Sequence, residues 1–203
     1  METSADLDRT SVASAEATTA RVLAAARTTL LTYDSSAFTV RQVAKIAGVS
    51  EMTIYRRWPR KADLMVAVVL FEIERFVEQM ESRVTSDMTV EEVVVEGFLT
   101  TYRYVQTNPV FVRLIAAESD KILPLLTAGV GGVFALLRPI IANRMRSAKD
   151  GHDYTADDLE GSAEVMLRIC HSLWLTPDSH FALETDADLR AFARRSLVPL
   201  LRI

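Results

Sequence analysis

The sequence predicts an all-α protein, on three observations. Apolar residues recur at helical spacing along most of the chain, no Asn-Gly or Asp-Gly hairpin signal occurs, and only 7 glycines and 6 prolines are found among 203 residues. Hydrophobic residues make up 49% and charged residues 25%, which is typical of globular proteins and argues against disorder. The length suits one domain or two small ones.

The N-terminal region is predicted to be a tail followed by one helix. Residues 1–15 include acidic residues and no apolar core segment, so they are expected to form a disordered tail and not a signal peptide. The segment from about Glu16 to Tyr33 is rich in Ala and Leu and is typical of a helix. Residues 34–36 (DSS) are expected to end it.

Two short helices joined by a tight turn follow. Thr39 and Gln42 have the spacing of a capping box, which begins the first helix, and Gly48 suits a left-handed exit at its end. Ser50 is a good cap for the second helix, which is expected to end at Trp58. This arrangement predicts a helix–turn–helix, whose second helix reaches base edges in the major groove with its N-terminal residues.

The distribution of charge supports this interpretation. The formal net charge is −4, but residues 1–70 carry 9 Lys/Arg and 7 Asp/Glu, whereas residues 71–203 carry 14 and 20. Residues 39–61 hold six basic side chains and a single acidic one, Glu51. A basic stretch on an acidic body binds a polyanion locally and keeps the rest of the protein away from it.

Longer helices are predicted for the remainder of the chain. They cover about residues 61–83, 90–106, 110–118, 123–147, 157–175 and 187–201. Asn108-Pro109 separates the second from the third, and Pro139 with three nearby glycines is expected to distort the fourth.

The stretch TVRQVAKIAGVSEMTIYRRWPRKADL closely resembles the DNA-binding signature of TetR-family (tetracycline-repressor-like) transcriptional regulators. The resemblance covers about residues 16–66, a quarter of the chain. It implies an N-terminal three-helix DNA-binding domain at residues 16–62 and a larger helical effector-binding and dimerisation domain at residues 63–203. The matching positions are Thr39, Val43, Ala44, the turn 47–50, Thr53, Ile54, Tyr55, Trp58, Lys61 and Leu64.

The resemblance also implies roles for individual residues. Phosphate contacts are expected from Thr39, Tyr55 and Lys61, with Arg56 and Arg57 adding to them. The complete predicted DNA-binding set is Thr39, Arg41, Ser50, Glu51, Met52, Thr53, Tyr55, Arg56, Arg57 and Lys61. Three positions depart from the family pattern: Met52 replaces a frequent glycine, Trp58 a frequent phenylalanine, and Arg60 a common capping serine. Ile54 and Trp58 are expected to belong to the core.

No catalytic constellation can be found in residues 90–203. The three histidines form no His-Glu-x-x-His motif or His/Cys cluster, and no phosphate-loop glycine pattern occurs, so the expectation is a protein that is not an enzyme and has no metal and no cofactor. Cys170 lies on an apolar helical stripe and is expected to be a buried, unreactive thiol. One cysteine excludes an internal disulfide and suits a reducing, cytoplasmic location. The longest strongly apolar run, residues 64–71, is too short to span a membrane.

For the C-terminal helices, the resemblance implies a pocket for a small hydrophobic effector, although core packing is the simpler interpretation of any single residue. The predicted ligand-binding set is Phe98, Tyr102, Phe111, Arg113, Phe134, Met166, Cys170, His171 and Trp174. The last two long helices are expected to form a homodimer interface. Leu167, Leu189, Phe192, Leu197 and Leu200 suit either that interface or the interior of the subunit.

Together these observations favour a homodimeric repressor. We expect it to bind an inverted-repeat operator in double-stranded DNA and to be released by a small lipophilic effector. Two alternatives remain open at this point: a DNA-binding regulator without a small-molecule effector, and an all-α small-molecule carrier whose basic stretch is incidental.

Overall fold

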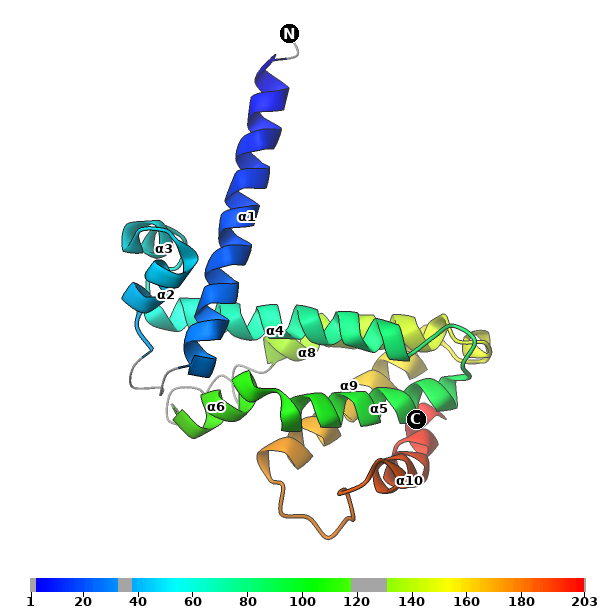
Figure 1. Cartoon of the computed structure of the whole chain (residues 1–203). Helices are drawn as coiled ribbons and strands as arrows, with labels where there is room; N and C mark the ends of the chain where they lie inside the picture. Colours follow the sequence, from blue (N-terminus) through cyan, green and yellow to red (C-terminus); the bar gives the residue numbers. More distant parts are fainter. Residues whose placement is uncertain (1–2, 33–37, 118–130, 203) are drawn as a thin grey trace. The chain divides into compact units, whose positions relative to one another are not determined.

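The structure, a computed structural model, describes residues 3–32, 38–117 and 131–202 (Figure 1). The helices are α1 (Thr3–Thr32), α2 (Val40–Ala47), α3 (Glu51–Arg57), α4 (Lys61–Arg83), α5 (Val90–Thr107), α6 (Pro109–Ala117), α8 (Gly131–Arg146), α9 (Ala156–Leu175) and α10 (Asp186–Ser196), with two 3₁₀ helices, η2 (Gly151–Asp153) and η3 (Val198–Arg202). No strand occurs in these ranges, and the prediction of an all-α fold is confirmed.

The chain divides into two compact units. The head unit comprises Met1–Glu74 and Pro109–Ser119, and the body unit comprises Arg75–Asn108 and Asp120–Ile203. One division falls inside α4, and another falls between α5 and α6. The sequence places the division near residue 62 and assigns α6 to the C-terminal domain. The structural division differs because α6 packs against α1.

The first helix is longer than expected. A tail is predicted for residues 1–15, but α1 already begins at Thr3. The segment contains no Gly or Pro that would interrupt a helix, which is the physical reason for the continuation. The predicted stop at residues 34–36 lies outside the described residues.

In the head unit, α2 packs against both α1 and α3 (Figure 1). Thr39 caps α2 with the predicted capping box: its hydroxyl accepts from the Gln42 amide, and the Gln42 side chain accepts from the Thr39 amide. Gly48 ends α2 in the left-handed conformation, with φ 67° and ψ 37°, which costs a side-chain-bearing residue energy but not glycine. Ser50 then caps α3 through the Thr53 amide. The local geometry of the helix–turn–helix is therefore as predicted.

The body unit is built around α5, which packs against α8, α9 and α10. The capping box of α2 recurs at the start of three body helices, through Thr89, Thr155 and Thr185. The C-terminal helix ends earlier than expected: α10 stops at Ser196, and η3, which contains Pro199, replaces its last turn. A proline removes the amide that the continuing helix needs.

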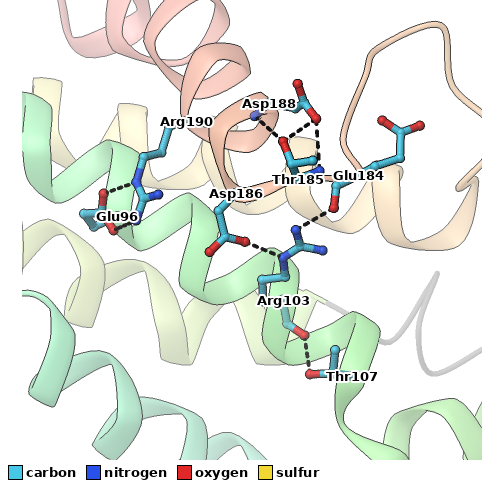
Figure 2. Close-up of polar contacts among 8 residues, drawn as sticks. All are labelled: Glu96, Arg103, Thr107, Glu184, Thr185, Asp186, Asp188 and Arg190. Atoms are coloured by element: carbon cyan, nitrogen blue, oxygen red, sulfur yellow. Dashed lines mark hydrogen bonds and ion pairs between the residues drawn. The ribbon is translucent and has the colours of Figure 1, made fainter.

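Two arginine–carboxylate pairs join α10 and the residues before it to α5 (Figure 2). Arg190 of α10 donates to both carboxylate oxygens of Glu96, at 2.6 and 3.1 Å. Arg103 of α5 donates to the Asp186 carboxylate at 2.9 Å and to the Glu184 backbone carbonyl at 2.6 Å. These contacts supplement an apolar contact in which the rings of Phe98 and Phe192 lie 5.2 Å apart.

The five leucine and phenylalanine residues considered for an interface are mostly interior. Leu167, Leu189, Phe192 and Leu197 are buried within the chain, and Leu200 is half-buried. Of the two interpretations that the sequence leaves open, the interior one applies to the first four. Among the described helices, none has the length and apolar character that a membrane crossing requires.

Candidate functional site

The predicted DNA-binding residues all belong to the head unit and all reach its surface. Thr53 and Lys61 are half-buried, and the other eight are exposed. They come from α2, α3, the caps of these two helices and the first residue of α4. Lys45, Ile46 and Arg60 are also exposed and lie outside the predicted set, although Lys45 and Arg60 belong to the basic stretch.

The orientation of α3 follows from one buried side chain. Ile54 is 0% exposed, as expected for a core residue, and Trp58 is half-buried at the helix end. Because consecutive residues of an α-helix are rotated by about 100°, Met52 and Arg56 lie opposite Ile54, on the outermost face. Tyr55, 42% exposed, lies beside them. The outward face of α3 is therefore made of the residues that sequence reasoning assigned to DNA.

Several of these side chains are held by neighbours. The hydroxyls of Ser50 and Thr53 lie 2.8 Å apart and share a hydrogen bond. The guanidinium of Arg57 lies over the Trp58 ring at 5.7 Å, and the ammonium of Lys61 lies over the Phe38 ring at 5.3 Å. Such contacts limit the freedom of long cationic side chains and hold their charge at the surface.

Arg60 stands before α4, at the position where a capping serine is common in the family. In this chain a different side chain caps the helix. The Asp63 carboxylate accepts from the Arg60 backbone amide at 3.0 Å and from its guanidinium at 3.2 and 3.0 Å. These hydrogen bonds lower the pKa of Asp63 and raise that of Arg60. The start of α4 is therefore fixed by a carboxylate three residues downstream.

The predicted ligand-binding residues do not all belong to one unit. Phe111 and Arg113 lie in the head unit, where Phe111 is buried and the Arg113 guanidinium donates to the Leu30 carbonyl at 3.0 Å. This hydrogen bond serves one of the last carbonyls of α1. The other seven predicted residues lie in the body unit.

Those seven divide into two groups. Phe98, Met166 and Cys170 line a cavity, and Tyr102 stacks on Phe98 with ring centroids 5.8 Å apart. The second group consists of Phe134, His171 and Trp174. The His171 ring lies 5.5 Å from that of Phe134 and 6.2 Å from that of Trp174, both edge-on.

The cavity has a volume of about 30 Å³ and lies between α4, α5, α8 and α9 of the body unit. Its lining includes residues that the sequence analysis did not assign to a ligand: Met80, Val84, Val93, Val94, Gly97, Thr101, Ile141, Arg144, Met145 and Leu167. Helical periodicity marks Val94 and Thr101 as inward-facing, but periodicity alone does not separate a cavity wall from a packed core.

Polar chemistry in the cavity is limited. Arg144 is paired with Glu81 at 2.8 Å. Burial raises the pKa of the Cys170 thiol to about 12, so this side chain stays a neutral thiol at physiological pH, in line with the expected unreactive role. No cluster of three or more His, Cys, Asp or Glu side chains suited to a metal ion occurs among the residues that the structure describes.

Comparison with known proteins agrees with the geometry of the head unit. Residues 22–68 match the family model "Bacterial regulatory proteins, tetR family". The chain is 26% identical over 184 residues to the HTH-type transcriptional regulator AlkX of Mycobacterium tuberculosis (strain ATCC 25618 / H37Rv), covering 88% of this chain and 82% of that protein.

Two solved structures share the fold. One is the TetR family repressor AlkX from Dietzia sp. strain DQ12-45-1b, described as implicated in biodegradation of n-alkanes, with a TM-score of 0.72, 22% identity and coverage of 89% of this chain and 93% of that one. The other is a TetR transcriptional regulator from Rhodococcus sp. RHA1, with a TM-score of 0.58, 20% identity and coverage of 92% and 95%. Residues 22–68, which contain the helix–turn–helix at residues 40–57, therefore match the DNA-binding domain of the TetR family, and the chain as a whole is similar to TetR-family transcriptional regulators.

Proposed function

We propose that the protein is a homodimeric repressor that binds an inverted-repeat operator and leaves it when a small lipophilic effector enters the body unit. The observation that carries the proposal is the outward face of the helix–turn–helix. It combines hydroxyl and basic side chains with a short helix whose apolar side is fixed by Ile54. Such a surface suits phosphate contacts at its edges and base contacts at the start of α3.

The dimer is supported by the surface of α9. Val165 and Ile169 are one helical turn apart and half-buried, and Gly161, one turn earlier, is exposed with open space around its Cα. A helix face with apolar and small residues allows close approach of a second helix. A two-fold dimer duplicates the DNA-binding surface and therefore calls for a two-fold operator.

The effector is supported by the lining of the body cavity, where apolar side chains predominate. A volume of about 30 Å³ holds one or two water molecules at most, so an effector must displace side chains in order to enter. Met80, Met145 and Met166 line this cavity, and methionine side chains repack easily. The Dietzia relative is described as implicated in n-alkane biodegradation, and we extend this to a saturated hydrocarbon chain as the effector class here.

The small cavity also favours one alternative, a regulator without a small-molecule effector. An effector acts only through its difference in affinity for the DNA-binding and the released conformation. A hydrocarbon that binds the protein and leaves its affinity for the operator unchanged would support this alternative. Failure of every medium- or long-chain alkane, alcohol and fatty acid to bind would do the same.

The first experiment is selection of duplexes from a random library by the purified full chain at near-physiological salt. We expect enrichment of an inverted repeat. If a dimer makes about six to eight phosphate contacts, log K should fall with log salt with a slope of about −5 to −7. Weak binding at low salt only, with no enriched motif, would contradict the proposal and favour the small-molecule carrier.

A single substitution tests the phosphate role of the basic residues. Arg57→Ala removes one exposed cation per subunit, so we expect a more than tenfold loss of operator affinity and a salt slope shallower by about two for the dimer. The matched control is Arg195→Ala, which removes an exposed arginine of the body unit and should leave binding unchanged. Equal binding by both variants would remove Arg57 from the DNA-binding surface.

A further inference from the structure

The side chain of Met52 is unusually exposed for its chemistry. It is 76% exposed, more than the other large exposed hydrophobic residues, which range from 40% to 49%. It lies in the first turn of α3, directly opposite the buried Ile54. An apolar side chain at the centre of the outward face gains nothing from water, and folding does not require it there.

Its neighbours leave Met52 as the large apolar side chain that is exposed in the first turn of α3. The Ser50 and Thr53 hydroxyls bond to each other and to the helix backbone. Glu51, also exposed, carries a negative charge that phosphate repels. The first turn of α3 therefore suits base edges better than the phosphate backbone, which Arg56 and Arg57 at the other end of the helix suit.

The C5 methyl group of thymine is the largest apolar group on the base edges of the major groove, and it is the best match for an apolar side chain. Guanine, cytosine and adenine display hydrogen-bond donors and acceptors there, whereas thymine adds the C5 methyl group. A thioether is a weak acceptor. It therefore cannot replace the hydrogen bond to water that a donor or acceptor of the base loses on contact. Burial of Met52 against a methyl group removes apolar surface of both partners from water without leaving a polar group unsatisfied.

We propose that Met52 recognises the C5 methyl group of a thymine in each half-site of the operator. The proposal rests on DNA binding through α3 and adds a specificity determinant to it. Each operator half-site then contains one thymine whose methyl group, and not its hydrogen-bonding groups, contributes to affinity.

The test uses the operator obtained by selection, with each thymine in turn replaced by deoxyuridine in both half-sites. Deoxyuridine keeps the O4 acceptor and base pairing and lacks only the methyl group. At one position we expect the wild-type protein to lose about fourfold in affinity for each half-site, which corresponds to ~0.8 kcal/mol for one buried carbon. Replacement in both half-sites should therefore cost about 15-fold.

Variants of Met52 assign the effect to this side chain. Met52→Ala and Met52→Gln should bind the thymine and uracil operators with equal affinity, whereas Met52→Leu should keep most of the discrimination. Because the side chain is exposed, none of these changes should affect folding, which circular dichroism and low-salt binding to unrelated DNA would verify. Ile46→Ala, at another exposed apolar residue, is the matched control and should discriminate as the wild type does.

The outcomes are distinct. Loss of discrimination in Met52→Ala, with discrimination retained in Ile46→Ala, supports the proposal. An operator that binds specifically but tolerates uracil at every position overturns the proposal and leaves the function intact. The same holds if Met52→Ala discriminates as strongly as the wild type. If no duplex is bound specifically, both the DNA-binding role and the inference drawn from it fail.

Discussion

The head and body units hold helices together with the same chemical pair, under different solvation. In the head unit, Arg27 of α1 donates to Glu72 of α4 at 2.7 Å, and the Glu72 side chain is 0% exposed. In the body unit, the pairs Arg190–Glu96 and Arg103–Asp186 (Figure 2) have side chains that are 28% to 58% exposed. A buried carboxylate depends on its partners, whereas water can replace the partner of an exposed one.

The largest effect is expected from Arg27→Met. This change leaves the Glu72 carboxylate buried with one hydrogen-bond donor fewer, so the free energy of unfolding should fall by about 3 kcal/mol in urea denaturation.

The control for this prediction is the double variant Arg27→Met with Glu72→Leu. It replaces both partners by apolar side chains and should recover most of the lost stability. Equal losses in the single and the double variant would mean that packing of the arginine stem, and not the buried charge, is responsible.

A smaller effect is expected from Arg190→Ala. The pair is bidentate but its side chains are 36% and 28% exposed, so we expect a loss of about 0.5–1 kcal/mol. The loss should shrink when the unfolding is repeated in 1 M salt, where charges are screened over about 3 Å. A loss as large as that of Arg27→Met would show that solvation does not distinguish the two units.

The smallest effect is expected from Arg103→Ala. Its partner Asp186 is 58% exposed, and water can take over both that contact and the one to the Glu184 carbonyl. We expect a change within about 0.5 kcal/mol in the same urea titration. A clearly larger loss would indicate that the approach of the chain to α10 depends on this side chain.

These pairs also explain which parts of the molecule could be predicted from the sequence. The caps of α2 and α3 link residues three apart, so the pattern of Thr39, Gln42 and Ser50 predicted them correctly. The same pattern stands before α5, α9 and α10, at Thr89 and Thr185 for example, and was overlooked there. Contacts between residues that are close together in the sequence can therefore be predicted from a short sequence pattern.

Contacts between distant residues were not predictable in this way. Glu72 is 45 residues from Arg27, and Arg113 is 83 residues from the Leu30 carbonyl that it binds. The sequence analysis proposes Arg113 as a polar contact to a ligand, and the sequence carries no sign of the distant carbonyl that its guanidinium binds. For the same reason the walls of the body cavity, which include Met80 and Met145, could not be separated from ordinary core.

The division of the chain inside α4 has a consequence for the exchange of recognition modules. Domains are usually joined by exposed, flexible linkers, where recombination disturbs few contacts. Here the junction between Glu74 and Arg75 lies within an uninterrupted helix, and the head unit also includes residues 109–119 from later in the chain. A chimaera that transplants the head unit must therefore join two parts of one uninterrupted helix and also supply α6.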